Sequence, residues 1–420
     1  MGVLESRLLK RTYRAAIGVV LAGLGACGGP GSGVGSKPKG GSLPGFAYVT
    51  TASNGVVANG AVFQFAIGVD GSVTPLSNSR VSTGVNPTAV VADPTGHFVF
   101  VANQSDTTIS QYTVGADGGL SPLSPAVVSV SQPYPQVASY SMAVDPTGNF
   151  LYAVAAPPPY PGPTGLTGIA QYAIQSDGTL KPLTPNRMNL TGSTRGPLVI
   201  DSSGHYAYLP IVNAALAAVV AQFSIAGDGT LQPLSPALVT ITTPQQPIPG
   251  LAGMTIAADG KTAYFLGECL SANCSGGVSP YNIGASGELT PIGTTALTGP
   301  HAFPLALISN AAGSSAYLLV DSMGVDTNSD AIYRYSIDTT GSLIGGTLTS
   351  LPVSPGSIVA RTYGANLYVL SANSVGFSSG SPSGGYIDHF STAADGTLMA
   401  AGSVPITANY PTDLTLVTAQ

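Results

Sequence analysis

The chain contains seven imperfect copies of one short turn phrase, and this repetition limits the folds that it can adopt. The clearest copies read Asp-Gly-Thr-Leu-x-Pro-Leu, then Ser or Thr, then Pro, at residues 177–185 and 228–236. The turn glycines are separated by 47, 60, 51, 58, 54 and 55 residues and are Gly71, Gly118, Gly178, Gly229, Gly287, Gly341 and Gly396. A near-constant period of this length in a β-rich chain is typical of propeller blades.

Each repeat has the pattern of four β-strands. Apolar and polar residues alternate before the phrase, as in residues 109–114, which indicates a half-buried strand. Asp-Gly favours a tight hairpin, because Gly accepts a positive φ. The Leu-x-Pro-Leu run predicts an outer strand, since Pro is tolerated where no ladder hydrogen bond is needed. Upstream, residues 89–101 read as an apolar strand, a Gly turn and an aromatic-rich strand.

The two ends of the chain predict how the ring closes. Residues 46–49 have the pattern of a second strand without a first, and residues 411–417 have that of a first strand with nothing after it. Pairing of the two would complete one blade and remove the exposed edges of an open sheet. We therefore predict an all-β, seven-bladed β-propeller over residues 46–420, with four antiparallel strands per blade and a blade shared by both termini.

The N-terminus has the pattern of an export signal. Four basic residues precede the short apolar run 15–26, which ends in Leu-Gly-Ala and is followed by Cys27. This resembles the lipobox of bacterial lipoproteins, and the alternative is an ordinary signal peptide with a nearby Cys. We expect residues 1–26 to be the signal peptide and residues 27–45 to be the lipidated Cys with a flexible tether. The expected location is the bacterial cell envelope, outside the cytoplasm, on the outer membrane if the cell has one.

Charge excludes one class of partner. The chain has 13 basic and 19 acidic residues, a net charge of −6, and only 8% charged residues. Nucleic-acid binding needs a basic stripe, so we expect no nucleic-acid partner. The expected partners are the membrane, through the N-terminal lipid anchor, and a protein, glycan or small molecule of unassigned identity.

Two cysteines remain beyond the signal, Cys269 and Cys274. In an exported protein such a close pair normally forms a disulfide, and a metal site is the alternative. Asp326, Asn328 and Asp330 have calcium-like spacing but lack the Gly and distal Glu of a complete loop, so they are a weak candidate. We expect no other metal and no cofactor.

Loop lengths predict where a site would lie. The first-to-second and third-to-fourth strand turns are short and stereotyped, whereas the other connections are long and differ between blades. In a propeller the long connections emerge together around the mouth of the central channel. Variable loops on a rigid scaffold usually carry function.

Few residues on this long-connection face can do chemistry. The candidates are Arg195 and His301, which precede innermost strands, Glu268 and Asp321, which follow second strands, and Arg361, within an innermost strand. A His and a carboxylate can act as base and acid, and an Arg can hold an oxyanion. The alternative is that each caps a turn or satisfies loop backbone.

Three motifs resemble those of the lactonase-family, YVTN-type seven-bladed propellers. They are the Asp-Pro-Thr-Gly strand pair, the Tyr-x-Ile/Val hairpin with Asp-Gly-x-Leu, and the opening Tyr-Val-Thr-Thr at 48–51. The resemblance covers residues 46–418 and implies the fold. The family includes 6-phosphogluconolactonases and a muconate-cycloisomerase-type enzyme, and its enzymes tend to show Gly-Pro-Arg-His before an innermost strand and Asn-Glu-Leu after the next strand. Here Arg195 and His301 lie in different blades, and the Glu is missing after both.

We therefore weigh two functions. The first is a non-catalytic binding or scaffold module that uses the long-connection face. The second is a lactone hydrolase acting at the channel mouth on a non-phosphorylated lactone. Hydrolysis of 6-phosphogluconolactone is not expected, because a phosphorylated substrate would need a basic cluster.

Overall fold

A computed structural model shows a closed ring of β-sheets. It describes residues 45–52, 60–130, 139–156, 166–194, 196–213, 215, 217–241, 250–268, 275–292, 296–300, 302–310, 312–322, 331–350, 357–372, 384–406 and 411–419. In this part of the chain every regular element is a strand. No helix among these residues is long and apolar enough to cross a membrane.

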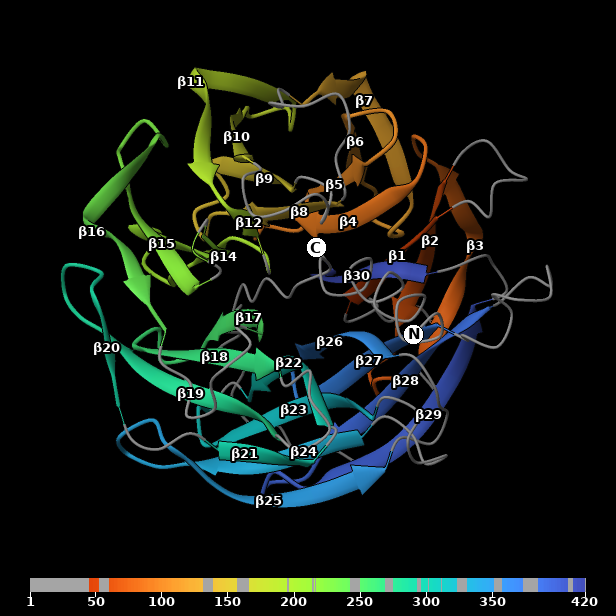
Figure 1. The fold of residues 1–420 in the computed structure, drawn as a ribbon. Coiled ribbons are helices and arrows are strands. Elements are labelled where there is room, and N and C mark those ends of the chain that lie inside the picture. Colours follow the sequence, from red (N-terminus) through yellow and green to blue (C-terminus); the bar gives the residue numbers. More distant parts are fainter. Residues whose placement is uncertain are drawn as a thin grey trace, which may run out of the picture.

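The strands form seven antiparallel blades, named I to VII, around a central axis (Figure 1). From the axis outward, blade I comprises β30 (Pro411–Thr418), β1 (Gly45–Thr51), β2 (Ala61–Ile67) and β3 (Val73–Ser82). Blade II comprises β4 (Pro87–Ala92), β5 (Phe98–Asn103), β6 (Thr108–Val114) and β7 (Leu120–Ser129). Blade III comprises β8 (Ser139–Val144), β9 (Phe150–Ala156), β10 (Leu166–Ile174) and β11 (Leu180–Thr191).

The remaining blades follow the same order. Blade IV comprises β12 (Ser193–Thr194) and β13 (Val199–Ile200) as its innermost strand, β14 (Tyr206–Val212), β15 (Ala218–Ile225) and β16 (Leu231–Thr240). Blade V comprises β17 (Gly250–Ile256), β18 (Thr262–Glu268), β19 (Ser275–Ile283), and β20 (Leu289–Pro291) and β21 (Ala296–Pro300) as its outermost strand. Blade VI comprises β22 (Ala302–Ser309), β23 (Ser315–Ser322), β24 (Ala331–Ile337) and β25 (Leu343–Ser350). Blade VII comprises β26 (Ser357–Tyr363), β27 (Asn366–Ala372), β28 (Gly385–Thr392) and β29 (Leu398–Ile406).

Blade I is built from both ends of the chain, as the sequence predicts. β1 pairs with β30 in antiparallel register, with Gly45 opposite Thr418 and Val49 opposite Leu414. The innermost strand of blade I is therefore the C-terminal strand β30, and no sheet edge is left open where the ring closes. The prediction of a seven-bladed, all-β propeller is confirmed.

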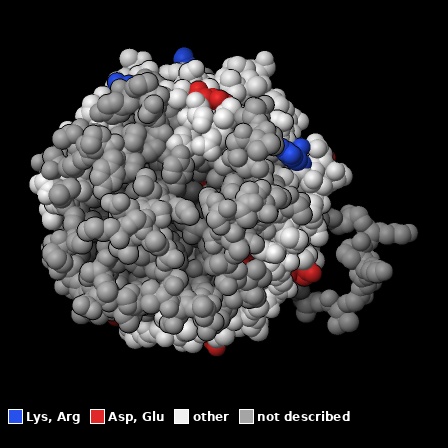
Figure 2. All heavy atoms as spheres, turned by 45° about the vertical axis from the view of Figure 1, so that its right-hand side comes forward, with Lys and Arg blue, Asp and Glu red and all other residues white. Residues whose placement is uncertain are grey.

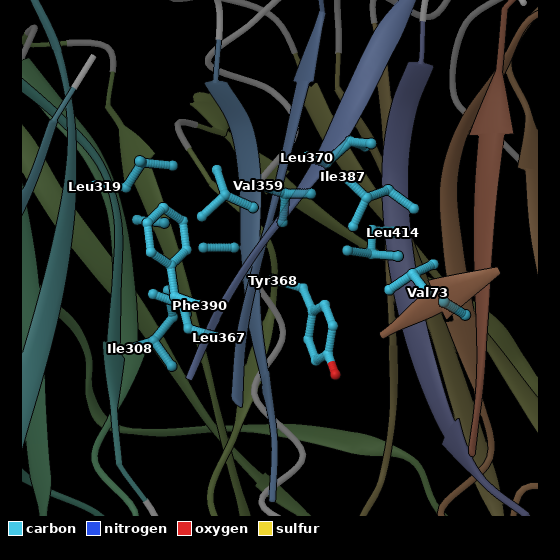
Figure 3. Packing of buried hydrophobic residues seen from close by; sticks show 14 of the residues in the cluster. Val73, Ile308, Leu319, Val359, Leu367, Tyr368, Leu370, Ile387, Phe390 and Leu414 are labelled. Carbon is cyan, nitrogen blue, oxygen red and sulfur yellow. The ribbon is translucent and has the colours of Figure 1, made fainter. Parts of the chain in front are cut away.

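The hydrophobic core lies in the seams between blades. One buried cluster joins blades VI, VII and I, and part of it is shown in Figure 3. Phe390 of β28 lies on the side of Ile308 and Leu319 from blade VI, whereas Ile387 lies on the side of Leu414 from blade I. Successive residues of a strand point to opposite faces, so each blade contributes apolar side chains to two seams.

A tyrosine hydroxyl links neighbouring blades at six seams among the described residues. In each case a buried Tyr of the second strand donates to the carbonyl of the turn glycine in the next blade, at 2.7–2.9 Å. The pairs are Tyr48 with Gly118, Tyr152 with Gly229, Tyr208 with Gly287, Tyr264 with Gly341, Tyr317 with Gly396, and Tyr368 with Gly71. The repeated turn thus also serves as an inter-blade acceptor, which explains why its geometry recurs.

Gly118 shows why this turn position takes glycine. Its φ is 82°, and a Cβ there would lie 2.2 Å from a ring carbon of Phe46 in blade I. Both the left-handed backbone and the close approach of the neighbouring blade therefore exclude a larger side chain.

The seam between blades II and III offers a test of the tyrosine links. Phe100 occupies the tyrosine position of β5 and is fully buried, and Phe98, two residues earlier on this strand, lies against the Gly178 turn of blade III. We expect Phe100→Tyr to raise the free energy of unfolding by about 1 kcal/mol, the net value of a typical hydrogen bond. Urea denaturation would measure the change.

Tyr152→Phe is the matched control, because it removes the same bond from the next seam and should cost a similar amount. A Phe100→Tyr variant that is less stable than the parent would show that this seam has no room for the hydroxyl.

Candidate functional site

The two faces of the ring differ in how their connections are built. On the short-turn face, carboxylates hold the turns. Asp93 accepts hydrogen bonds from the backbone N–H groups of Thr95 and Phe98, at 3.0 and 2.7 Å. Asp177 accepts one from Thr179 N–H at 2.9 Å, and hydrogen bonds with Thr179 lower its pKa. The acidic residues of this face are engaged in turn structure, which leaves the opposite, long-connection face as the candidate site.

The structure places the backbones of two predicted catalytic positions, Glu268 and Asp321, at the long-connection ends of the second strands of blades V and VI. Glu268 is the last residue of β18 in blade V, and Asp321 lies near the end of β23 in blade VI. In the sequence, Arg195 directly follows β12 of blade IV, and His301 directly precedes β22 of blade VI. The backbones of Glu268 and Asp321 pair with Gly250 and Phe303.

Several predicted side chains lie outside the described residues. Arg195 and His301 do, and so do the side chains of Glu268 and Asp321. The same holds for the proposed lipidation site Cys27 and for the Cys269–Cys274 pair, and for the weak calcium candidate Asp326, Asn328 and Asp330. These assignments therefore stay predictions. Within the described ranges, no three His, Cys, Asp or Glu side chains are grouped as a metal site.

Arg361, the fifth candidate, is described and is engaged in a buried ion pair. Its guanidinium lies 3.2 Å from the Asp413 carboxylate, and the two side chains are 12% and 6% exposed. Arg361 is on β26 and Asp413 is on β30, so the pair joins the innermost strands of blades VII and I. Burial raises the pKa of Asp413, and the nearby guanidinium opposes that shift.

Asp413 also reaches the innermost strand of blade II. Its second carboxylate oxygen accepts the backbone N–H of Val90 at 3.0 Å, and the first accepts that of Leu414 at 2.9 Å. Next to it, the Thr412 hydroxyl lies 3.0 Å from the Pro87 carbonyl. Asp413 therefore ties the closing strand to both of its neighbours, and Arg361 balances its charge. This pair holds the ring closed.

His389 marks the seam between blades VII and I. Its position on β28, opposite Tyr368, is that of the glutamines Gln64, Gln111 and Gln171 in blades I to III. Each of these amides accepts a backbone N–H of the next blade, at 2.6–2.8 Å. His389 instead bonds Asn366 at 2.9 Å and stacks on Tyr368.

This seam should weaken in mild acid. Burial lowers the pKa of His389 below its ordinary value of 6.5, and the Asp70 carboxylate opposes the shift. Near pH 6.5 the folded protein therefore binds fewer protons at His389 than the unfolded chain does. The stabilisation that neutral His389 contributes is present above pH 6.5 and is lost as the pH falls below this value. We expect the melting temperature to fall as the pH is lowered from about 7.5 to about 5.5, a range around the ordinary pKa of histidine.

His389→Gln is the matched variant, because it installs the residue found at this position in blades I to III. It should reduce the difference between the melting temperatures at the two pH values. An unchanged difference would assign the acid sensitivity to another group.

The fold and the arrangement of connections define a closed seven-bladed propeller with its candidate site at one mouth of the channel. A family model described as "Lactonase, 7-bladed beta-propeller" matches residues 44–305, so the chain belongs to this family. Among curated proteins, none is significantly similar to the chain in sequence.

Solved structures of low sequence identity share the fold. A periplasmic gluconolactonase of Pseudomonas aeruginosa is 19% identical, with a TM-score of 0.67, over 90% of this chain and 99% of that one. A Bacteroides uniformis protein provisionally described as a 6-phosphogluconolactonase is 17% identical, with a TM-score of 0.64, over 89% and 99%. A Lactobacillus plantarum protein is 13% identical, with a TM-score of 0.65, over 89% and 99%.

Proposed function

We propose that this protein is an extracytoplasmic, lipid-anchored propeller that binds a ligand on its long-connection face, around the mouth of the central channel. The observation that carries the proposal is that the connections on one face repeat from blade to blade, whereas those on the other face vary. The short-turn face is built from repeated turns whose carboxylates stabilise the turns themselves and whose glycine carbonyls accept hydrogen bonds from the neighbouring blades. Variation between blades is concentrated in the connections at the other end, where it can alter binding without weakening the ring.

The charge distribution favours a ligand without phosphate groups. The whole chain has only 13 Lys and Arg in 420 residues, and those visible among the described residues in Figure 2 are scattered. The Arg361 guanidinium is already paired with Asp413. A phosphorylated ligand would need several basic groups at one place, so a neutral ligand such as a sugar or a sugar lactone fits this chain better.

Lactone hydrolysis is the second candidate. It is favoured by the family of the chain and by the gluconolactonase activity in the name of a structural relative. In this reading Arg195 holds the oxyanion formed at the lactone carbonyl, and His301 acts as the base that activates water, with Glu268 or Asp321 as its carboxylate partner.

A lactone panel separates the two candidates. The purified chain without its signal would be given glucono-δ-lactone, other non-phosphorylated lactones and 6-phosphogluconolactone, and acid release would be followed above the spontaneous rate. Binding without turnover supports the first candidate. Turnover that is lost in Arg195→Ala or His301→Ala, at an unchanged melting temperature, supports the second. We expect no turnover of 6-phosphogluconolactone.

The lipid anchor requires its own experiment. Acyl chains on Cys27 contribute about 0.8 kcal/mol per buried CH₂, which suffices for stable membrane association when more than one chain is present. Cys27→Ser should move the protein from the membrane to the soluble fraction without changing its melting temperature. Mass spectrometry that finds no lipid on the parent protein would rule out the anchor.

A further inference from the structure

Asp388 lies in the seam between blades VI and VII with its side chain fully buried. Phe390, two residues later on β28, points toward Ile308 and Leu319 of blade VI (Figure 3). Residues two apart on a strand share a face, so Asp388 points into the same seam. Burial raises the pKa of its carboxyl, and the Ser403 hydroxyl on β29 partly offsets this rise without reaching hydrogen-bond geometry.

Two polar groups in this seam have no hydrogen-bond partner among the described residues. They are the Asp388 carboxylate, at both of its oxygens, and the Ser371 hydroxyl, which is 3% exposed. Asp388 is opposite Val369 and Ser371 is opposite Tyr386 on the paired strands β27 and β28, so the two side chains are diagonal neighbours on one face. Buried polar groups normally have a partner, because leaving one without costs free energy.

The equivalent positions of blade II show that side chains there reach one another. Ser110 is opposite Val101 on β5 and β6, as Asp388 is opposite Val369, and Asn103 takes the place of Ser371. Asn103 Nδ2 donates to Ser110 Oγ at 2.9 Å, and Thr83 donates to Asn103 Oδ1 at 2.8 Å. That seam satisfies its polar groups internally. In blade VII an anionic side chain and a hydroxyl occupy the same two places.

We propose that Asp388 and Ser371 form a binding site for a monovalent metal cation, with Na⁺ as the probe, between blades VI and VII. Carboxylate and hydroxyl oxygens are hard donors that suit alkali and alkaline-earth cations. A single positive charge neutralises one carboxylate, whereas a divalent ion would leave a net charge in a seam lined by apolar side chains. The site lies where β27 ends, at the long-connection end of the seam, and the cation would hold blades VI and VII together there.

Thermal unfolding in NaCl and in choline chloride at equal ionic strength tests the site. Binding to the folded state alone should raise the melting temperature by about 2 °C for each tenfold increase in Na⁺ above the dissociation constant. Choline is too large and too weakly coordinating to replace Na⁺, so its salt should give no such rise. Identical curves in the two salts would overturn the proposal, as would equal stabilisation by micromolar Ca²⁺, which would assign a divalent site.

Three variants locate the effect. Asp388→Asn should abolish the Na⁺ dependence. The double variant Asp388→Ser with Ser371→Asn copies blade II and should fold without that dependence, even if the single variant fails to fold. Asp177→Asn, which removes a carboxylate from an exposed turn, should keep the full Na⁺ response. Retention of the response in a folded Asp388 variant would overturn the proposal.

Discussion

Deletion of residues 411–420 should prevent the ring from closing and abolish cooperative unfolding of the native propeller. The deletion removes β30, which pairs with β1 along its length, and exposes the sheet edge of β1. It also removes Leu414 and Val417, which are 0% and 1% exposed and pack in two different seams. Burial of each such side chain stabilises by about 1.5–3 kcal/mol, so the total loss is comparable to the stability of a typical domain.

The deletion is checked by solubility, circular dichroism and thermal unfolding. Removal of Gln420 alone is the control and should leave the melting temperature unchanged, because β30 ends at Thr418. A soluble product of the longer deletion with the melting temperature of the parent would show that blade I does not depend on β30.

Breaking the Arg361–Asp413 pair should give the largest effect of any single substitution considered. Removal of one partner leaves the other buried without its counter-charge, which costs about 3–5 kcal/mol. Asp413→Ala should cost more than Arg361→Ala, because it also leaves the backbone N–H of Val90 without its acceptor. Urea denaturation of both variants would measure these losses.

A double variant separates charge from packing. Arg361→Met combined with Asp413→Asn removes both charges and keeps an acceptor for Val90, so it should recover much of the stability lost in either alanine variant. Additive losses in the double variant would mean that the two side chains act independently. Asp177→Asn, in an exposed turn, should cost little by comparison.

The sequence predicts the ring well because its signals are local and repeated. The Asp-Gly turns, the proline-containing outer strands and the unpaired strand patterns at the two ends each depend on a few neighbouring residues. Each copy of the turn phrase is a weak indication by itself, but seven copies at similar spacing indicate a repeat fold. This is why the number of blades and the shared blade I are confirmed.

The links between blades are harder to predict from the sequence, although their residues are visible in it. A Tyr in the second strand looks like an ordinary buried residue. Its hydroxyl acquires a role only through a turn of the next blade that is far away in the sequence, 70 residues for Tyr48 and Gly118 and 297 for Tyr368 and Gly71. Asp413 and His389 share this difficulty, because their partners lie on other strands. For Asp413, the sequence did contain a signal, because a carboxylate within the apolar run 411–417 needs a buried partner.

The candidate site shows a different limit. The strand order places the ends of the second and fourth strands of every blade at one end of the ring, but Arg195 and His301 lie outside the described residues. Arg361 was predicted from its place on an innermost strand as a group that could hold an anion. The structure instead pairs it with Asp413, because a cation buried beside the closing strand is stabilised by a neighbouring carboxylate.

The position of Gly45 sets the face of the ring at which the proposed lipid anchor would join it. Gly45 lies opposite Thr418, at the end of blade I where the innermost strand finishes, and this is the short-turn face of the ring. If Cys27 carries the proposed lipid, the chain that links it to the propeller enters the ring at that face. The lipid bilayer would then lie beneath the turns, and the channel mouth with its long connections would face outward, accessible to molecules that arrive from the surrounding medium.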